Sequence, residues 1–185
     1  MLKDSATGYG LVTIILHWVC AGLIVFLFGL GVYMRNLDYY SPWYHRGPEI
    51  HIALGILLFA LMCARLFWRL LNTTPAQLPS VSKNNYLAAN LVKFALYTSI
   101  FIICITGYLI TTAEGQGAHF FDLFSIPASI KLKSHNVDRA GFIHKYLAWG
   151  TLAIALVHAL AALFHHFLKR DATLLRMLKP NQKSH

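Results

Sequence analysis

The sequence predicts an all-α fold, an integral membrane four-helix bundle, from its composition and from four long apolar segments. Hydrophobic residues make up 57% of the 185 residues and charged residues only 12%, whereas soluble domains carry about 25% charged residues. A chain this apolar lacks the polar surface that a domain in water needs. We therefore expect lipid to surround it.

A helix that crosses a bilayer needs about 20 consecutive, mostly apolar residues. Four segments meet this requirement, at about residues 11–33, 50–71, 87–113 and 141–168. The six prolines fall between or after these segments, and Pro48 is placed to open the second helix, where its missing N–H has no helical partner to lose. We expect all four spans to form one domain, residues 1–185.

The basic residues predict how the chain is oriented. The net charge of +9 is also compatible with nucleic-acid binding, but the Lys and Arg residues cluster at the ends of the apolar segments, as membrane-flanking charges do. The first segment is too long for the core of a signal peptide and shows no small-residue cleavage site, so we expect it to be retained. We expect a multi-pass protein of the bacterial inner membrane with both termini in the cytoplasm.

In this orientation the inner side has ten basic residues: Lys3, Arg65, Arg69, Lys83, Lys93, Lys169, Arg170, Arg176, Lys179 and Lys183. The outer side has six: Arg35, Arg46, Lys131, Lys133, Arg139 and Lys145. The long outer connection 111–138 contains an aromatic stretch at residues 119–124, which we expect on the membrane surface or over a site.

Four histidines lie inside the spans, where ionisable residues are costly and usually functional. His144 and His158 are fourteen residues apart, or about 21 Å along the helix and about 40° short of four turns, so they share one face at two depths. His51 lies at the outer depth of His144, and His17 lies at the inner depth of His158. The spacing therefore predicts an outer pair, His51 with His144, and an inner pair, His17 with His158.

Two imidazoles that face each other across a helix bundle are the axial ligands of a low-spin haem. The histidines therefore predict two haem b groups, with iron as the metal at both pairs. Zinc or copper is the competing interpretation, but each depth offers only two nitrogens and no Cys, Asp or Glu, whereas zinc needs three or four ligands. The three cysteines form no CxxC or CxxCH motif, which disfavours a disulfide framework and covalent haem attachment.

Residues at matching depths suggest how a haem could be accommodated. Arg65 follows His51 by fourteen residues, so it shares that face at the inner depth and could pair a haem propionate; the alternative is a snorkelling arginine at the helix end. Gly31 and Gly55 leave space for a porphyrin plane, although glycine also serves helix packing in membranes.

His165 is the candidate quinone-binding residue. It follows His158 by seven residues on the same face, about 10 Å nearer the cytoplasm, and could donate to a quinone carbonyl. The alternative is an interfacial histidine without a ligand. His166 points about 80° away and is the poorer candidate. No ligand role is expected for His45, His119, His135 or His185.

With these residues in place, the chain resembles the bacterial cytochrome b561 family, the four-helix di-haem type, and within it the enterobacterial superoxide oxidases. The resemblance is carried by His17-Trp18, by Glu49-Ile50-His51, by Ile143-His144-Lys145, and by the stretches 158–166 and 171–177. It implies His17 and His158 on the inner haem and His51 and His144 on the outer haem. It also implies ubiquinone near the inner haem and, in the superoxide oxidases, superoxide as the outer donor.

The sequence thus predicts a membrane di-haem b-type cytochrome that moves electrons between a periplasmic donor and ubiquinone. With superoxide as donor it would be a superoxide:ubiquinone oxidoreductase. The alternatives are a haem b electron-transfer or anchor subunit that serves a periplasmic redox protein, and a membrane adaptor without haem. Superoxide is an anion, but the charge of the six outer basic residues is nearly balanced by five outer acidic ones, which weakens the attraction of an anion. These are Asp38, Glu49, Glu114, Asp122 and Asp138.

Overall fold

The computed structural model describes residues 1–180; Lys183 and His185 lie outside the described residues. Four helices account for most of the chain: α1 Leu11–Met34, α2 Trp43–Leu71, α3 Lys83–Thr111 and α4 Ser134–Phe167. Each of the four is long and apolar enough to cross a membrane. The all-α prediction is confirmed, and the chain is a multi-pass membrane protein.

The helices are apolar around most of their circumference, as spans in lipid are. Large apolar side chains lie on the outside, with Phe94 of α3 being 71% exposed. A helix satisfies its backbone N–H and C=O groups within the segment, which the bilayer core requires. The exposed aromatic and aliphatic side chains are therefore the surface that meets lipid.

Three of the helices extend further than the sequence indicated. Helix α2 begins at Trp43 instead of residue 50, α3 at Lys83 instead of residue 87, and α4 at Ser134 instead of residue 141. The expectation counted apolar residues only, but helical hydrogen bonding continues through polar residues at the membrane surface. Pro48 consequently lies inside α2 and does not open it. Because proline has no N–H, the helix lacks only the hydrogen bond that residue 48 would donate to the carbonyl of Tyr44.

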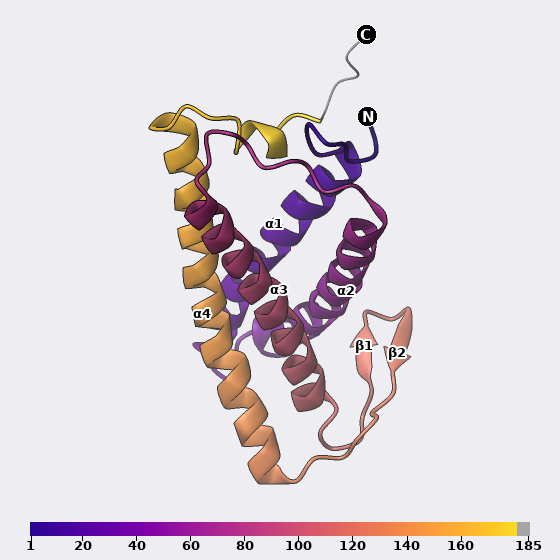
Figure 1. The fold of residues 1–185 in the computed structure, drawn as a ribbon. Coiled ribbons are helices and arrows are strands. Elements are labelled where there is room, and N and C mark those ends of the chain that lie inside the picture. Colours follow the sequence, from indigo (N-terminus) through magenta and orange to yellow (C-terminus); the bar gives the residue numbers. More distant parts are fainter. Residues whose placement is uncertain (181–185) are drawn as a thin grey trace. The chain divides into compact units, whose positions relative to one another are not determined.

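The connection between α3 and α4 contains a small hairpin that the sequence did not predict (Figure 1). Strand β1, Ala118–Phe120, pairs antiparallel with β2, Phe124–Ile126, with Ala118 opposite Ile126. The Phe120 and Phe124 rings stack at 5.0 Å between centroids, and Phe121 turns the chain at a φ of 47°. Strands of three residues are too short to give an alternating pattern that could be recognised.

The described chain divides into two compact units, and every helix contributes a segment to each. The first unit comprises residues 1–21, 61–97 and 153–180, and the second comprises residues 22–60 and 98–152. His17 and His158 belong to the first unit, and His51 and His144 belong to the second. Each predicted histidine pair therefore lies within one unit.

The two ends of the described chain meet inside the first unit. The Trp18 indole N–H donates to the carbonyl of Met177 at 2.8 Å, and the Arg176 guanidinium donates to the carbonyl of Ala76 at 2.8 Å. The Ala76 N–H in turn donates to the carbonyl of Ala6 at 2.8 Å. The segment after α4 is thus held against α1 and against the connection between α2 and α3.

Candidate functional site

In the second unit, α2 and α4 bring His51 and His144 together. The ring centroids are 6.2 Å apart and the ring planes meet at 62°. Both side chains are partly buried. The two imidazoles that the sequence placed at one depth are therefore neighbours.

Hydrogen bonds from α3 fix how His144 presents its ring. Its Nδ1 lies 2.9 Å from the carbonyl oxygen of Ile103 and 3.3 Å from the hydroxyl of Thr106. A carbonyl can only accept, so Nδ1 carries the hydrogen, and the Nε2 lone pair remains available. This is the arrangement of a metal-binding histidine, in which the second ring nitrogen donates to the protein.

A cavity of about 950 Å³ lies beside this pair. Both imidazoles line it, together with apolar side chains such as Phe28, Phe59 and Trp149, and with the two cations Arg35 and Lys145. Ala118 and Ile126 of the hairpin also line it, so the connection expected to lie over a site does border this cavity. The volume lies at the upper end of the range for ligand sites, about 300–1,000 Å³.

Two glycines allow facing helices to approach the histidine rings. A Cβ added at Gly107 of α3 would lie 3.1 Å from Cε1 of His144, and one at Gly31 of α1 would lie 3.4 Å from Cε1 of His51. The space at Gly31 is therefore used by the imidazole as well as by the cavity. Gly107 was missed because α3 has no histidine from which to count, although it is the only glycine of that helix.

In the first unit, α1 and α4 bring His17 and His158 together. The ring centroids are 6.4 Å apart and the planes meet at 74°. The guanidinium of Arg65, on α2, lies 2.8 Å from Nδ1 of His17 and stands over the Tyr97 ring. Because a guanidinium only donates, Nδ1 of His17 is an acceptor here, the opposite of His144.

Comparison with known proteins identifies the family. The model of the prokaryotic cytochrome b561 family matches residues 8–180. The chain belongs to this family. It is therefore a membrane b-type cytochrome of an electron-transport family, and the family's cofactor is haem b.

Relatives in several bacteria match nearly the whole chain. Cytochrome b561 homolog 2 of Escherichia coli is 41% identical over 175 residues, which cover 95% of this chain and 93% of the relative. A probable superoxide oxidase, CybB, of Yersinia pestis is 28% identical over 92% of this chain and 95% of the relative. Cytochrome b561 homolog 1 of Escherichia coli is 27% identical over 92% and 96%.

The residues of this chain suit the haem of the cytochrome b561 family. Two iron–nitrogen bonds of about 2 Å, together with the half-widths of the rings, place the centroids of two axial imidazoles about 6 Å apart. Both pairs have this spacing. In the second unit Nδ1 of His51 and the hydroxyl of Thr151 are buried without a hydrogen-bond partner among the described residues, which fits a site that a bound group completes.

His165, the sequence's candidate for quinone binding, contacts a carboxylate at the end of α4. Its Nδ1 lies 2.5 Å from Oδ2 of Asp171. The sequence analysis assigned Asp171 no role of its own, although it begins the stretch 171–177 that carries part of the family resemblance and is acidic among the basic residues that follow the last span. The neighbouring His166 has a buried Nδ1 without a partner among the described residues.

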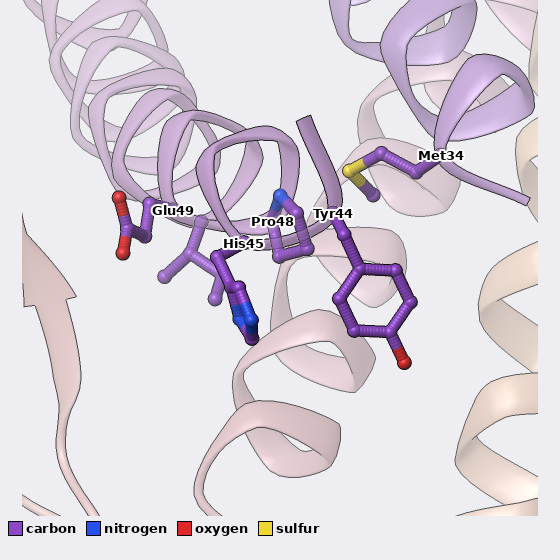
Figure 2. A pocket seen from close by; sticks show the side chains of 6 residues that line it. Met34, Tyr44, His45, Pro48 and Glu49 are labelled. Carbon is purple, nitrogen blue, oxygen red and sulfur yellow. The ribbon is translucent and has the colours of Figure 1, made fainter. Parts of the chain in front are cut away.

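A second pocket, of about 460 Å³, opens at the start of α2 and shares Met34, Pro48 and Ile52 with the larger cavity. Tyr44, His45 and Glu49 complete its lining. In Figure 2 Met34 and Tyr44 lie to one side of Pro48 and Glu49 lies to the other. This pocket is an approach to the larger cavity that carries one carboxylate and one imidazole but no Lys or Arg.

Replacing Gly107 by valine should lower the haem content of the cytochrome by about one haem per chain. The first side-chain carbon alone would come within 3.1 Å of the His144 ring, and the two methyl groups would displace it further. Pyridine haemochrome analysis of the purified protein measures the effect. Gly150→Val is the matched control, because a Cβ there meets nothing within 4 Å. Equal haem contents in both variants would contradict the assigned role of Gly107.

Proposed function

We propose that each histidine pair binds one haem b, and that the protein passes electrons from a donor on the His51–His144 side to ubiquinone on the His17–His158 side. The observation that carries the proposal is the repetition of one arrangement: two imidazoles about 6 Å apart, within each compact unit. Bound haem supplies one-electron chemistry. The orientation expected from the basic residues, with both termini in the cytoplasm of the bacterial inner membrane, belongs to this proposal.

The protein's part is to orient the imidazoles and to balance charge. The Ile103 carbonyl holds Nδ1 of His144, which leaves Nε2 as the nitrogen that would bind iron. Arg35 and Lys145, which line the cavity, are suited to pair the haem propionates of this unit.

Arg65 is suited to the same task in the first unit, after a change of partner. Its donation to Nδ1 of His17 leaves the ring's hydrogen on Nε2, which is the nitrogen that would bind iron. For His17 to become a ligand, the hydrogen must move to Nδ1, and the guanidinium must let go of the ring. A propionate is then the natural acceptor for Arg65.

Superoxide is the first candidate donor. A probable superoxide oxidase is among the relatives, at 28% identity, which supports superoxide as one candidate. Against strong steering of an anion, the smaller pocket presents Glu49 and no Lys or Arg.

A second candidate function is an electron-transfer subunit that accepts electrons from a periplasmic redox protein. It is favoured by the hairpin that borders the large cavity. Phe121, Leu123 and Phe124 at its tip are 48%, 76% and 53% exposed. A cluster of exposed apolar side chains next to a redox site is typical of a protein-docking surface.

The two pairs predict a pattern of haem loss. The unaltered protein should contain about two b haems, because each pair would hold one haem iron. His51→Ala and His144→Ala should each lose the same haem, and His17→Ala and His158→Ala should each lose the other. Low-temperature difference spectra distinguish the two haems. Identical spectral losses from His17→Ala and His51→Ala would refute the pairing.

If superoxide is the donor, superoxide generated by xanthine oxidase should reduce the haems, and superoxide dismutase should abolish the reduction. The rate should fall modestly as salt rises, because steering is screened over about 8 Å at physiological ionic strength. Glu49→Gln should raise the rate about twofold, since two unit charges about 8 Å apart in water interact by about 0.5 kcal/mol. Glu114→Gln, outside both pockets, is the control. If reduction proceeds equally with the dismutase present, superoxide is not the donor and a protein donor is favoured.

His165→Ala should leave both haems in place and slow their oxidation by a short-chain ubiquinone by about 100-fold, the lower range for loss of a general acid. Stopped-flow absorbance of the pre-reduced protein follows this reaction. His166→Ala, the adjacent histidine on another face, serves as the control. An unchanged rate in His165→Ala would assign His165 to the membrane interface alone.

A further inference from the structure

A buried carboxylate follows the last turn of α4. Asp171 lies four residues after α4 ends at Phe167, and its side chain is only 4% exposed. Among residues 1–180 it is the one buried acidic residue. The chain reverses at Arg170, which has a φ of 52°, and the Asp171 N–H donates to the carbonyl of His165 at 3.1 Å. The reversal aims the carboxylate at the imidazole of His165.

Both carboxylate oxygens of Asp171 accept hydrogen bonds. Oδ2 lies 2.5 Å from Nδ1 of His165, and Oδ1 accepts the backbone N–H of Thr173 at 2.9 Å. Burial raises the pKa of the Asp171 carboxyl, but the hydrogen bonds from Thr173 and His165 lower it by more, so the pKa lies below its ordinary value. The carboxylate is therefore ionised at neutral pH.

The cations closest in sequence do not compete for this carboxylate. Lys169 stands over the Phe164 ring at 5.9 Å, the Arg176 guanidinium donates to the Ala76 carbonyl, and Arg170 is exposed. The groups that bond Asp171 are His165 and Thr173, the latter through its backbone N–H and its side chain. Its negative charge is thus directed at one imidazole.

We propose that Asp171 is a positioning residue that pairs with the His165 imidazole and turns its Nε2–H toward a quinone carbonyl. The proposal rests on the quinone role proposed above for His165. An ionised acceptor at Nδ1 fixes the ring orientation and stabilises the imidazolium, as an aspartate does beside a catalytic histidine. Asp171 itself does not touch the quinone.

Quinone reduction consumes protons, and the His165–Asp171 pair can supply one of them. A quinone becomes a quinol by gaining two electrons, delivered singly from the reduced haems, and two protons. One proton passes from Nε2 of His165 to a quinone oxygen, so an N–H bond breaks and an O–H bond forms. His165 is left neutral, with its Nδ1–H still donated to Asp171. Water restores the proton, since the His165 side chain is 16% exposed, and water also supplies the second proton.

The Asp171→Asn variant tests the negative charge of Asp171 apart from its structural hydrogen bond. Asparagine keeps the oxygen that accepts from Thr173 but loses the negative charge. Oxidation of the pre-reduced protein by ubiquinone with one isoprene unit should slow about tenfold at pH 7.5, less than the roughly 100-fold expected for loss of the acid itself, because His165 is still present. Oxidation by ferricyanide, which takes no proton, should be unchanged. Asp171→Glu, which keeps the negative charge, should retain most of the quinone rate, whereas His165→Ala should not.

The matched control is Asp38→Asn. Asp38 also accepts an N–H from two residues further on, that of Tyr40 at 2.9 Å, but it is exposed. If His165→Ala slows quinone reduction and Asp171→Asn does not, the positioning role is overturned while the quinone site stands. If neither variant slows it, the quinone role of His165 fails and this inference fails with it. Slower ferricyanide oxidation or haem loss in Asp171→Asn would make Asp171 a structural residue only.

Discussion

The structure depends on one constraint: an imidazole in a membrane interior must find a partner for both of its ring nitrogens. Water is absent there, and an unsatisfied polar atom is costly. His144 meets the constraint on one side through the Ile103 carbonyl. The ring also lines a cavity that it shares with His51. This two-sided requirement is what makes a pair of spanning histidines a sign of a bound metal rather than of ordinary packing.

The helical repeat explains how much of the site could be predicted from the sequence. Fourteen residues return a helix nearly to the same face, so the spacing alone assigns His144 and His158 to one side of α4 and to two depths. The same counting placed Arg65 at the inner depth, the depth of His17, and the two groups lie 2.8 Å apart. Four apolar segments were sufficient for the fold class, because a segment of about 20 apolar residues has the length of a helix that crosses the bilayer and satisfies its own backbone groups.

What could not be predicted depends on contacts between segments without periodic relation. Gly107 matters because α3 passes against the His144 ring, and nothing in the α3 sequence indicates its neighbour. Asp171 matters because the chain reverses at Arg170, a non-glycine residue in a conformation that sequence rarely reveals. The early starts of α2 and α4 were missed for another reason: hydropathy marks the lipid boundary, whereas helical hydrogen bonds continue beyond it.

The two histidine pairs differ in the charge that their Nδ1 atoms meet. His144 donates to a neutral carbonyl, which increases the electron density on the ring and favours the more oxidised metal. His17 lies beside the guanidinium of Arg65, and a nearby cation favours the state with less positive charge, the reduced one. Even after Arg65 turns to a propionate, its charge remains in this unit. The cavity beside His51 and His144 is also lined by two cations, Arg35 and Lys145, so positive charge would favour the reduced state in both units, and the partner of Nδ1 is what distinguishes the two pairs.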